Sequence, residues 1–310
     1  MNKSRELYEG LWEVVTEDSF FFIGWFREAH ANAFAEEVAS GNIVSPSDRL
    51  ADIACGDSAY PGAVSRTCGT TFVGLDLSSA ALRESRRLLR GIYPERDSSV
   101  ASLPQNDKQR RARNDRKAES LCAGLVQGEA SQLPLASAAF DVVLSTHTLE
   151  HLSRDKETLE EFARILKMGG YLRLEVPNSK RQMLPLFRPL QGRLDRLGHL
   201  KEYRPGELTA LLSQCKFSVQ RFYYRDFLLC WLFFSLEEHF RPIVRLFRRG
   251  RAEHRAVPEK GRFWHLLAAA LSRLILWENR LLDKRSWGMN ACCIARKTPS
   301  PVKGEGQGEG

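Results

Sequence analysis

The sequence lacks the features typical of secreted, metal-clustered or membrane-spanning proteins. Its seven cysteines include no C-x-x-C pair and no second ligand set at metal-binding spacing, so no metal site is predicted. An odd, scattered number of cysteines suits a reducing compartment. The opening residues, MNKSRELYEGLWEVV, lack the apolar stretch of a signal peptide. The longest apolar run, at 227–234, is too short to cross a bilayer as a helix. These absences predict a cytoplasmic protein.

The charge of the chain is unevenly distributed. Its 310 residues carry a formal net charge of +8, and basic residues cluster at Arg83–Arg90, Lys108–Lys117 and Arg241–Arg255. Such clusters attract anionic partners, including nucleic acid, acidic lipid headgroups and phosphorylated substrates. A solvated surface explains the same clusters equally well. The length accommodates one α/β domain with attachments, or two small domains.

Short apolar runs alternate with helical patterns between residues 50 and 176, which predicts parallel βαβ units. One predicted helix begins at Ser78 or Ser79, whose hydroxyls can cap it. Another begins at Ser153 or Asp155 and stops at Gly169–Gly170. The predicted strands lie at 49–54, 71–76, 124–128, 140–145, 171–176, 217–224 and 289–295.

These patterns divide the chain into a core and its attachments. The core is predicted at 45–225 plus 286–297, and it contains a polar, mobile insertion at 94–120. The predicted attachments are an N-terminal helical lid at 1–44, an apolar and basic helical insertion at 226–285, and a disordered tail at 298–310.

The segment LADIACGDS, residues 50–58, carries the strongest chemical signal. A strand ends there in a turn of small residues, which lets a ligand approach the backbone closely. Twenty residues after Gly56, Asp76 ends the next predicted strand. An acid at that place can accept hydrogen bonds from both hydroxyls of a ribose. The turn and the acid together predict a nucleoside-containing ligand at the carboxyl edge of the sheet.

The turn does not suit a dinucleotide. It lacks the G-x-G-x-x-G pattern that seats a pyrophosphate on a helix N-terminus. Asp57, inside the turn, would also repel a pyrophosphate, whereas a cationic sulfonium ligand without phosphates tolerates it. Local electrostatics therefore favour S-adenosylmethionine over NAD, and a dehydrogenase is disfavoured.

Seven motifs in order resemble the class I S-adenosylmethionine-dependent methyltransferases, within their small-molecule (type 11-like) group. They are LADIACG, GLDLS, GEASQLPL, FDVVLS, HTLEHL, LKMGG and LRLEVPN. The downstream runs GHLKEYRPGEL and LLSQCKFSV resemble the same group, so the resemblance covers about residues 45–225 and the last strand. It implies a Rossmann-like three-layer αβα sheet of order 3-2-1-4-5-7-6, with the last strand antiparallel.

The resemblance also implies residue roles. The turn with Asp52, Ala54, Gly56 and Ser58 would lie under the methionine part of the cofactor. Asp76 would hold the ribose, Leu77 would pack on the adenine, Glu129 and Ala130 would contact the adenine edge, and His147 would lie near the sulfur. Alanine and serine replace two family glycines, at 54 and 58, and glutamate replaces the usual aspartate at 129. Met168 replaces the proline of the family's LKPGG turn.

The catalytic candidates lie on the acceptor side. Positioning does most of the work in a methyl transfer, and a general base helps when the acceptor is a hydroxyl or a protonated amine. His151 and His147 are the predicted bases, because a neutral imidazole near pH 7 suits that role. His151 is predicted to open the helix after the fourth strand. Glu150 is a further candidate, and His199 and Tyr203 lie on a loop that could also reach the acceptor.

The acceptor itself is less constrained. A nucleic-acid base is disfavoured, because the sequence after the fourth strand lacks the N/D-P-P-(Y/F) turn of base methyltransferases. A metal-dependent catechol-type reaction is disfavoured because no metal triad is evident. The insertion at 226–285 predicts a pocket cap for a large acceptor, a peripheral membrane contact or an oligomer interface. A small-molecule, glycan or lipid-linked acceptor fits. The alternative is a cofactor-free scaffold that binds a partner protein.

Overall fold

The computed structural model describes residues 21–92, 122–179, 184–185, 199–233, 235–236 and 262–299. The predicted insertion at 94–120, the first 20 residues of the predicted lid and residues 300–310 of the predicted tail lie outside them. The strands are β1 Arg49–Ile53, β2 Thr71–Asp76, β3 Cys122–Gln127, β4 Phe140–Thr146, β5 Leu166–Pro177, β6 Phe217–Arg225 and β7 Asn290–Lys297. The helices are α2 Phe21–Ser40, α3 Ala59–Cys68, α4 Ser79–Ile92, the short 3-10 helix η2 Leu149–His151, α6 Asp155–Ile165, α8 Pro205–Gln214 and α10 Arg262–Leu282.

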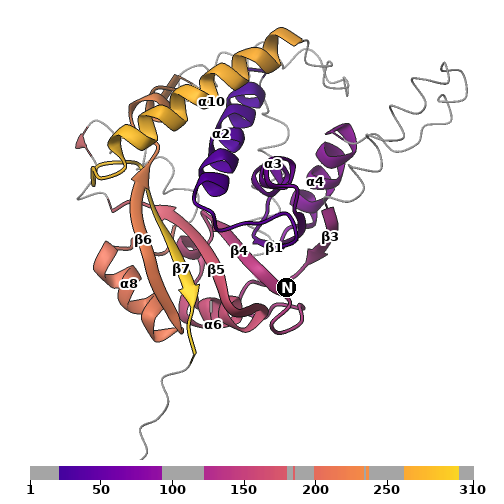
Figure 1. Ribbon diagram of the computed structural model, residues 1–310, viewed down its shortest axis with the longest axis vertical. Helices are drawn as coiled ribbons and strands as arrows, with labels where there is room; N and C mark the ends of the chain where they lie inside the picture. Colours follow the sequence, from indigo (N-terminus) through magenta and orange to yellow (C-terminus); the bar gives the residue numbers. More distant parts are fainter. Residues whose placement is uncertain are drawn as a thin grey trace, which may run out of the picture.

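The seven strands form one sheet in the order β3-β2-β1-β4-β5-β7-β6 (Figure 1). The pairs β1–β2, β1–β4, β2–β3 and β4–β5 are parallel. Strand β7 is antiparallel to both β5 and β6. The predicted strand order and the antiparallel last strand are confirmed, as are all seven predicted strands.

Side chains alternate between the two faces of the sheet along each strand, so apolar residues occur on both faces. Helices cover both of these faces. On one face, Leu50 and Val142 pack with α2 and α3 in one buried cluster. On the other face, Ala51 and Val143 pack with α6 and α8 in a second cluster. The Rossmann-like three-layer αβα architecture is therefore confirmed.

Two predicted helix boundaries have different outcomes. Helix α4 begins as predicted, and the backbone N–H of Ala81 donates to Oγ of Ser78 at 3.1 Å. The predicted stop of α6 at Gly169–Gly170 is wrong, because α6 ends at Ile165 and Leu166 already pairs with Phe140 of β4. Both glycines lie in β5 where its register with β4 is irregular, and a Cβ on Gly170 would come 2.8 Å from the carbonyl oxygen of Asp141.

The carboxyl ends of the parallel strands meet at one edge of the sheet. Strand β6 also ends at this edge, because it runs antiparallel to β7 and therefore parallel to β5. The segment that follows β6 and leads into α10 consequently departs from the same edge.

Helix α10 packs against α2 at the outer margin of the molecule, where Ala29 and Ala33 contact Ala268 and Ile275 in a third cluster (Figure 1). Among the described helices, none is long and apolar enough to cross a membrane.

Candidate cofactor and acceptor site

The turn between β1 and α3 has an unusual backbone. Ala54, Gly56 and Ser58 all adopt positive φ, at 61°, 54° and 60°. Left-handed backbone suits glycine, and small side chains limit its cost elsewhere. The hydroxyl of Ser58 also accepts a hydrogen bond from Oγ of Ser85 on α4 at 2.7 Å. The serine in place of a glycine thus ties the turn to the next helix.

Asp76 fixes this turn from the neighbouring strand. Its Oδ2 accepts a hydrogen bond from the N–H of Gly56 at 2.9 Å, and its Oδ1 accepts one from the N–H of Ser78 at 2.8 Å. The carboxylate is almost fully buried. A carboxylate oxygen has two lone pairs and can accept more than one hydrogen bond. The structure brings the predicted turn and the predicted ribose acid together.

Three acids gather beneath this turn. Asp52, Asp57 and Asp76 are all buried, and burial together with the Asp76 carboxylate raises the pKa of Asp52 well above its ordinary value. Arg27 of α2 forms an ion pair with Asp57. The pairing was not predictable from the sequence, because the two residues lie in separate elements with no shared motif. The turn is therefore a region of negative charge that one helix partly neutralises.

The residues predicted on the adenine side follow β2 and β3. Leu77 is half-buried, and its carbonyl accepts a hydrogen bond from Nε2 of Gln127 at 3.0 Å. Glu129 is exposed and accepts a hydrogen bond from Oγ of Ser131 at 2.8 Å, whereas Ala130 is buried. All three lie after the ends of neighbouring strands, at the same edge as Asp76. Their contact with a nucleoside stays a prediction.

His147 lies directly after β4 with a φ of 52°. Its Nδ1 is 3.3 Å from Oε1 of Glu150, and its Nε2 is 3.3 Å from Oε1 of Glu175. Partial burial lowers the pKa of His147, but the two nearby carboxylates raise it by a larger amount, to about 10. With a carboxylate beside each ring nitrogen, His147 is held as a cation at the edge of the sheet.

The second predicted base, His151, ends η2 and does not open a helix as predicted, because α6 begins only at Asp155. Its ring lies edge-on to His199, with the centroids 4.8 Å apart. The backbone N–H of Leu200 donates to the carbonyl of Glu150 at 2.8 Å, which docks the His199 loop onto η2. The structure therefore places His151, Glu150 and His199 together.

Tyr203 has a structural role in this loop. Its hydroxyl lies 3.2 Å from the carbonyl oxygen of Leu149 and 2.9 Å from Oδ2 of Asp155. Burial, reinforced by Asp155, raises its pKa above the ordinary value. The hydroxyl is therefore occupied in anchoring the loop.

Behind the site lies a buried charge network that the sequence analysis missed. Arg173 and Arg225 are fully buried, and both guanidinium groups lie near Oε2 of Glu175, at 2.7 and 3.4 Å. Glu37 of α2 also pairs with both arginines. Charged and apolar residues alternate in the strand LRLEV, residues 172–176. This alternation could have indicated the network, because charges inside a buried strand require partners.

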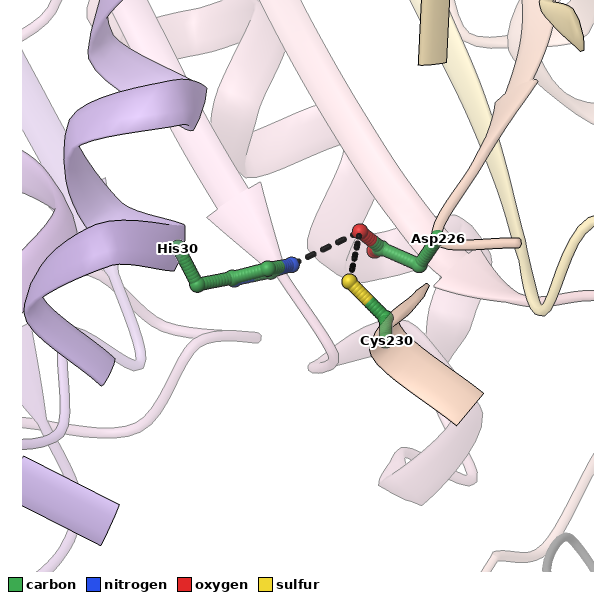
Figure 2. Close-up of side chains that lie close together, drawn as sticks. All are labelled: His30, Asp226 and Cys230. Atoms are coloured by element: carbon green, nitrogen blue, oxygen red, sulfur yellow. Dashed lines mark hydrogen bonds and ion pairs between the residues drawn. The ribbon is translucent and has the colours of Figure 1, made fainter. Parts of the chain in front are cut away.

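The network extends to α2 through His30, Asp226 and Cys230 (Figure 2). Oδ1 of Asp226 lies 2.7 Å from Nε2 of His30 and 3.3 Å from Sγ of Cys230. The other ring nitrogen of His30 is 2.8 Å from the hydroxyl of Tyr60, at the start of α3. These bonds connect α2 to the chain that follows β6.

Part of the predicted core matches a known family. A family model described as a methyltransferase domain matches residues 51–174. A probable S-adenosylmethionine-dependent methyltransferase of Mycolicibacterium smegmatis is 34% identical over 95 residues, which are 30% of this chain and 34% of that protein. A malonyl-[acyl-carrier protein] O-methyltransferase of Laribacter hongkongensis is 30% identical over 113 residues, or 34% of this chain and 38% of that protein. The chain matches about a third of the length of these relatives.

Solved structures show the same fold. A protein of Haloferax volcanii, solved in complex with the methyltransferase activator Trm112, is similar with a TM-score of 0.53 at 14% identity. That similarity covers 96% of this chain and 97% of the other. The [4+2]-cyclase SpnF is similar with a TM-score of 0.52 at 16% identity, covering 87% and 81% of the two chains.

The cyclase shows that the fold alone does not determine the reaction. The evidence that goes beyond the fold is the family match, whose residues include the turn after β1, Asp76 and His147. Residues 51–174 therefore match a methyltransferase domain family, and the similarity to S-adenosylmethionine-dependent methyltransferases supports S-adenosylmethionine as the cofactor.

Proposed function

We propose that this chain transfers a methyl group from S-adenosylmethionine to a small-molecule, glycan or lipid-linked acceptor by in-line displacement. The observation that supports this proposal best is the hydrogen bond from the N–H of Gly56 to Oδ2 of Asp76. It joins the small-residue turn to the strand-end acid at the carboxyl edge, where nucleoside ligands bind in open α/β sheets. When bound, S-adenosylmethionine supplies an activated methyl group on a positively charged sulfur.

The charge at the turn fits this cofactor. Asp52, Asp57 and Asp76 lie close enough that the other two acids raise the pKa of Asp52, after the larger effect of burial. A site that concentrates carboxylates favours a ligand that brings positive charge and disfavours one that brings phosphates. Asp76 would hold the ribose hydroxyls. Asp52, Ala54, Gly56 and Ser58 would line the methionine part, and Leu77, Glu129 and Ala130 the adenine.

On the acceptor side, the geometry distinguishes between the two predicted bases. Both ring nitrogens of His147 face carboxylates, on Glu150 and Glu175. His147 therefore serves as a positioned hydrogen-bond donor and does not take the proton of an acceptor. His151 is the better candidate for a group that contacts the acceptor, because it lies with His199 on the docked loop.

The acceptor class is suggested by the outer face of α10. The exposed large apolar side chains on this helix are Leu266, Leu274, Trp277 and Leu281, and Arg273 and Arg280 are exposed among them. Glu278, the only acid in α10, is buried. Aromatic, leucine and arginine side chains on one helical face are typical of helices that lie in an anionic membrane surface.

A second copy of the chain fits this face less well. A two-fold contact would bring Arg273 and Arg280 of both copies together, and like charges at an interface are unfavourable. We therefore propose that α10 contacts an anionic membrane, so that the acceptor is lipid-linked or made at the membrane. Because the chain that follows β6 leaves the same sheet edge as the cofactor turn, such a contact would orient the acceptor side toward the bilayer.

Cofactor binding tests the proposed function. We expect Asp76→Ala to bind S-adenosylmethionine about 10- to 100-fold more weakly, because hydrogen bonds to a charged group contribute about 1.5–3 kcal/mol. Asp76→Asn, which keeps one acceptor oxygen, should lie between this variant and the wild type. Isothermal calorimetry with S-adenosylmethionine and with S-adenosylhomocysteine measures both.

Asp283→Ala is the matched control, because this acid pairs with Arg221 at the surface and should not alter the affinity. Undiminished binding by Asp76→Ala would contradict the proposed ribose contact. If the wild type binds no S-adenosylmethionine even at high micromolar concentration, the cofactor-free scaffold is the better interpretation.

A further inference from the structure

A cluster on the acceptor side has the composition of a metal site. Glu150, His151 and His199 each offer one ligand atom, and these atoms all lie within 4.8 Å of one another. Two imidazoles and one carboxylate form a ligand set typical of Zn²⁺, Mn²⁺ and related divalent metals, with positions left open for water or substrate. The sequence did not reveal the cluster, because His199 is far from the other two residues along the chain.

The chain holds these three residues in place. Glu150 and His151 are consecutive in η2, directly after β4. The N–H groups of Leu200 and Lys201 donate to the carbonyl of Glu150 at 2.8 and 3.2 Å, so His199 is fixed against the same turn. The two imidazole rings meet at an interplanar angle of 67°. The three ligand atoms already lie close enough together to surround one ion.

The Glu150 carboxylate provides a second, independent indication of a ligand. It is completely buried, and within the described part of the chain its Oε2 has no hydrogen-bond partner. Oε1 has ring nitrogens near it, of His147 at 3.3 Å and of His151 at 3.8 Å. Buried carboxylates without hydrogen bonds are costly unless they are paired or bind a cation. We propose that Glu150, His151 and His199 bind a divalent transition metal such as Zn²⁺ or Mn²⁺.

A second cluster within the described residues, formed by His30, Asp226 and Cys230, does not share these properties. Asp226 already faces His30 and Cys230 (Figure 2). Its Oδ2 also accepts a hydrogen bond from Nδ2 of Asn290 at 2.7 Å. The Arg225 guanidinium lies 3.5 Å from Nε2 of His30, so both ring nitrogens of His30 and both oxygens of Asp226 already have partners. This cluster is satisfied without an ion and serves as an internal comparison.

The metal would have a role in the proposed reaction. An open coordination position next to the cofactor edge would hold and polarise an acceptor oxygen, which lowers the pKa of a hydroxyl. A metal-bound imidazole has no free lone pair, so His151 would act as a ligand and not as the base. This role rests on the proposed function, whereas the metal site itself does not.

Metal binding by the full, tag-free chain tests the site. After removal of metal by chelation, we expect one equivalent of Zn²⁺ to bind, measured against a chromophoric chelator. We expect His199→Gln and Glu150→Gln to weaken this binding at least about tenfold, or about 1.4 kcal/mol. Bound Co²⁺ should show visible absorption bands that change in His199→Gln, a signature that a purely structural role would not alter.

Two controls make the result unambiguous. His254→Gln removes a histidine elsewhere and should leave the affinity unchanged, and circular dichroism checks that each variant is folded. Wild-type affinity in both His199→Gln and Glu150→Gln, or no saturable Zn²⁺ binding by the wild type, would overturn the proposal. So would loss of binding in His30→Gln alone.

Calorimetry with S-adenosylmethionine separates this proposal from the proposed function. If Zn²⁺ binds as expected but S-adenosylmethionine does not, the metal site stands and the methyltransferase proposal fails. If S-adenosylmethionine binds but Zn²⁺ does not, the metal-site proposal fails and the methyltransferase proposal stands.

Discussion

Single residues at the cofactor turn have roles that depend on their exact size. Gly74 of β2 faces the turn after β1, where an added Cβ would lie 2.8 Å from Sγ of Cys55 and 2.9 Å from Cδ2 of Leu125. Cys55 in turn donates its backbone N–H to the carbonyl of Leu75 at 2.9 Å. The strand and the turn therefore approach each other closely only because position 74 has no side chain.

We expect Gly74→Ala to lower the free energy of unfolding by about 1–3 kcal/mol, because the added methyl group overpacks a filled site. The displaced turn should also bind S-adenosylmethionine more weakly. Chemical denaturation and calorimetry measure the two effects. Gly124→Ala on β3 is the matched control, since nothing lies within 4 Å of its added Cβ. Equal stability of both variants would show that the turn adjusts freely.

At the scale of elements, helix α2 is joined to the sheet by ion pairs as well as by apolar packing. Glu37 pairs with Arg173 and Arg225, and His30 faces Asp226. Burial raises the pKa of Asp226, but Arg225 and His30 lower it by more, so that it lies well below the ordinary value of 3.8. Glu175 acts in the opposite direction, because its negative charge raises the pKa of Asp226.

The pKa of Asp226 predicts a pH dependence of stability. A carboxylate whose pKa is lower in the folded protein stabilises the fold above the unfolded-state pKa, and this contribution is lost as the pH falls below that value. We expect Asp226→Asn to cost about 3–5 kcal/mol at pH 7, because it leaves buried Arg225 without a full partner. The difference from the wild type should shrink between pH 4 and pH 2, measured by urea unfolding.

Asp283→Asn, which changes an acid paired at the surface, should cost less than about 1 kcal/mol at any pH. A difference between Asp226→Asn and the wild type that stays constant down to pH 2 would contradict the assigned pKa direction.

At the scale of the whole molecule, α10 presents its exposed face away from the sheet. We expect the protein to float with vesicles of phosphatidylcholine and phosphatidylglycerol at low salt, and to remain in solution with phosphatidylcholine alone. Trp277→Ser combined with Leu281→Ser should reduce binding about tenfold or more, since each buried apolar side chain contributes about 1.5–3 kcal/mol. High salt should weaken binding through Arg273 and Arg280.

Met168→Ser is the control for the flotation experiment. Met168 is equally exposed, at 61%, but lies near the start of β5, at the opposite edge of the sheet from the cofactor turn. A wild-type protein that stays in the soluble fraction with anionic vesicles at low salt would rule out the membrane contact.

Much of the fold could be predicted from sequence because its signals are local. Strand periodicity, the helix cap at Ser78 and the spacing between Gly56 and Asp76 each lie within a short stretch of chain. The strand order came from the family resemblance. By contrast, the Arg27–Asp57 pair and the charge network join residues from distant elements, so no short motif encodes them.

The candidate site likewise has one part that the sequence predicts and one part that depends on tertiary contacts. The cofactor turn was visible as a motif, whereas the meeting of Glu150, His151 and His199 depends on how one loop docks onto η2. The end of α6 was mispredicted because Gly169–Gly170 has the appearance of a helix stop, while strand pairing from Leu166 decides the boundary. Tertiary contacts overrode a local signal at that point.

The position of β7 between β5 and β6 has a consequence for synthesis. Residues 290–297 supply hydrogen bonds to both neighbours, so the sheet stays split until this stretch has emerged from the ribosome. Until then, β5 and β6 each present an open edge, and open edges recruit other strands. Nascent chains that stall before residue 290 should therefore be the species that chaperones hold and proteases remove.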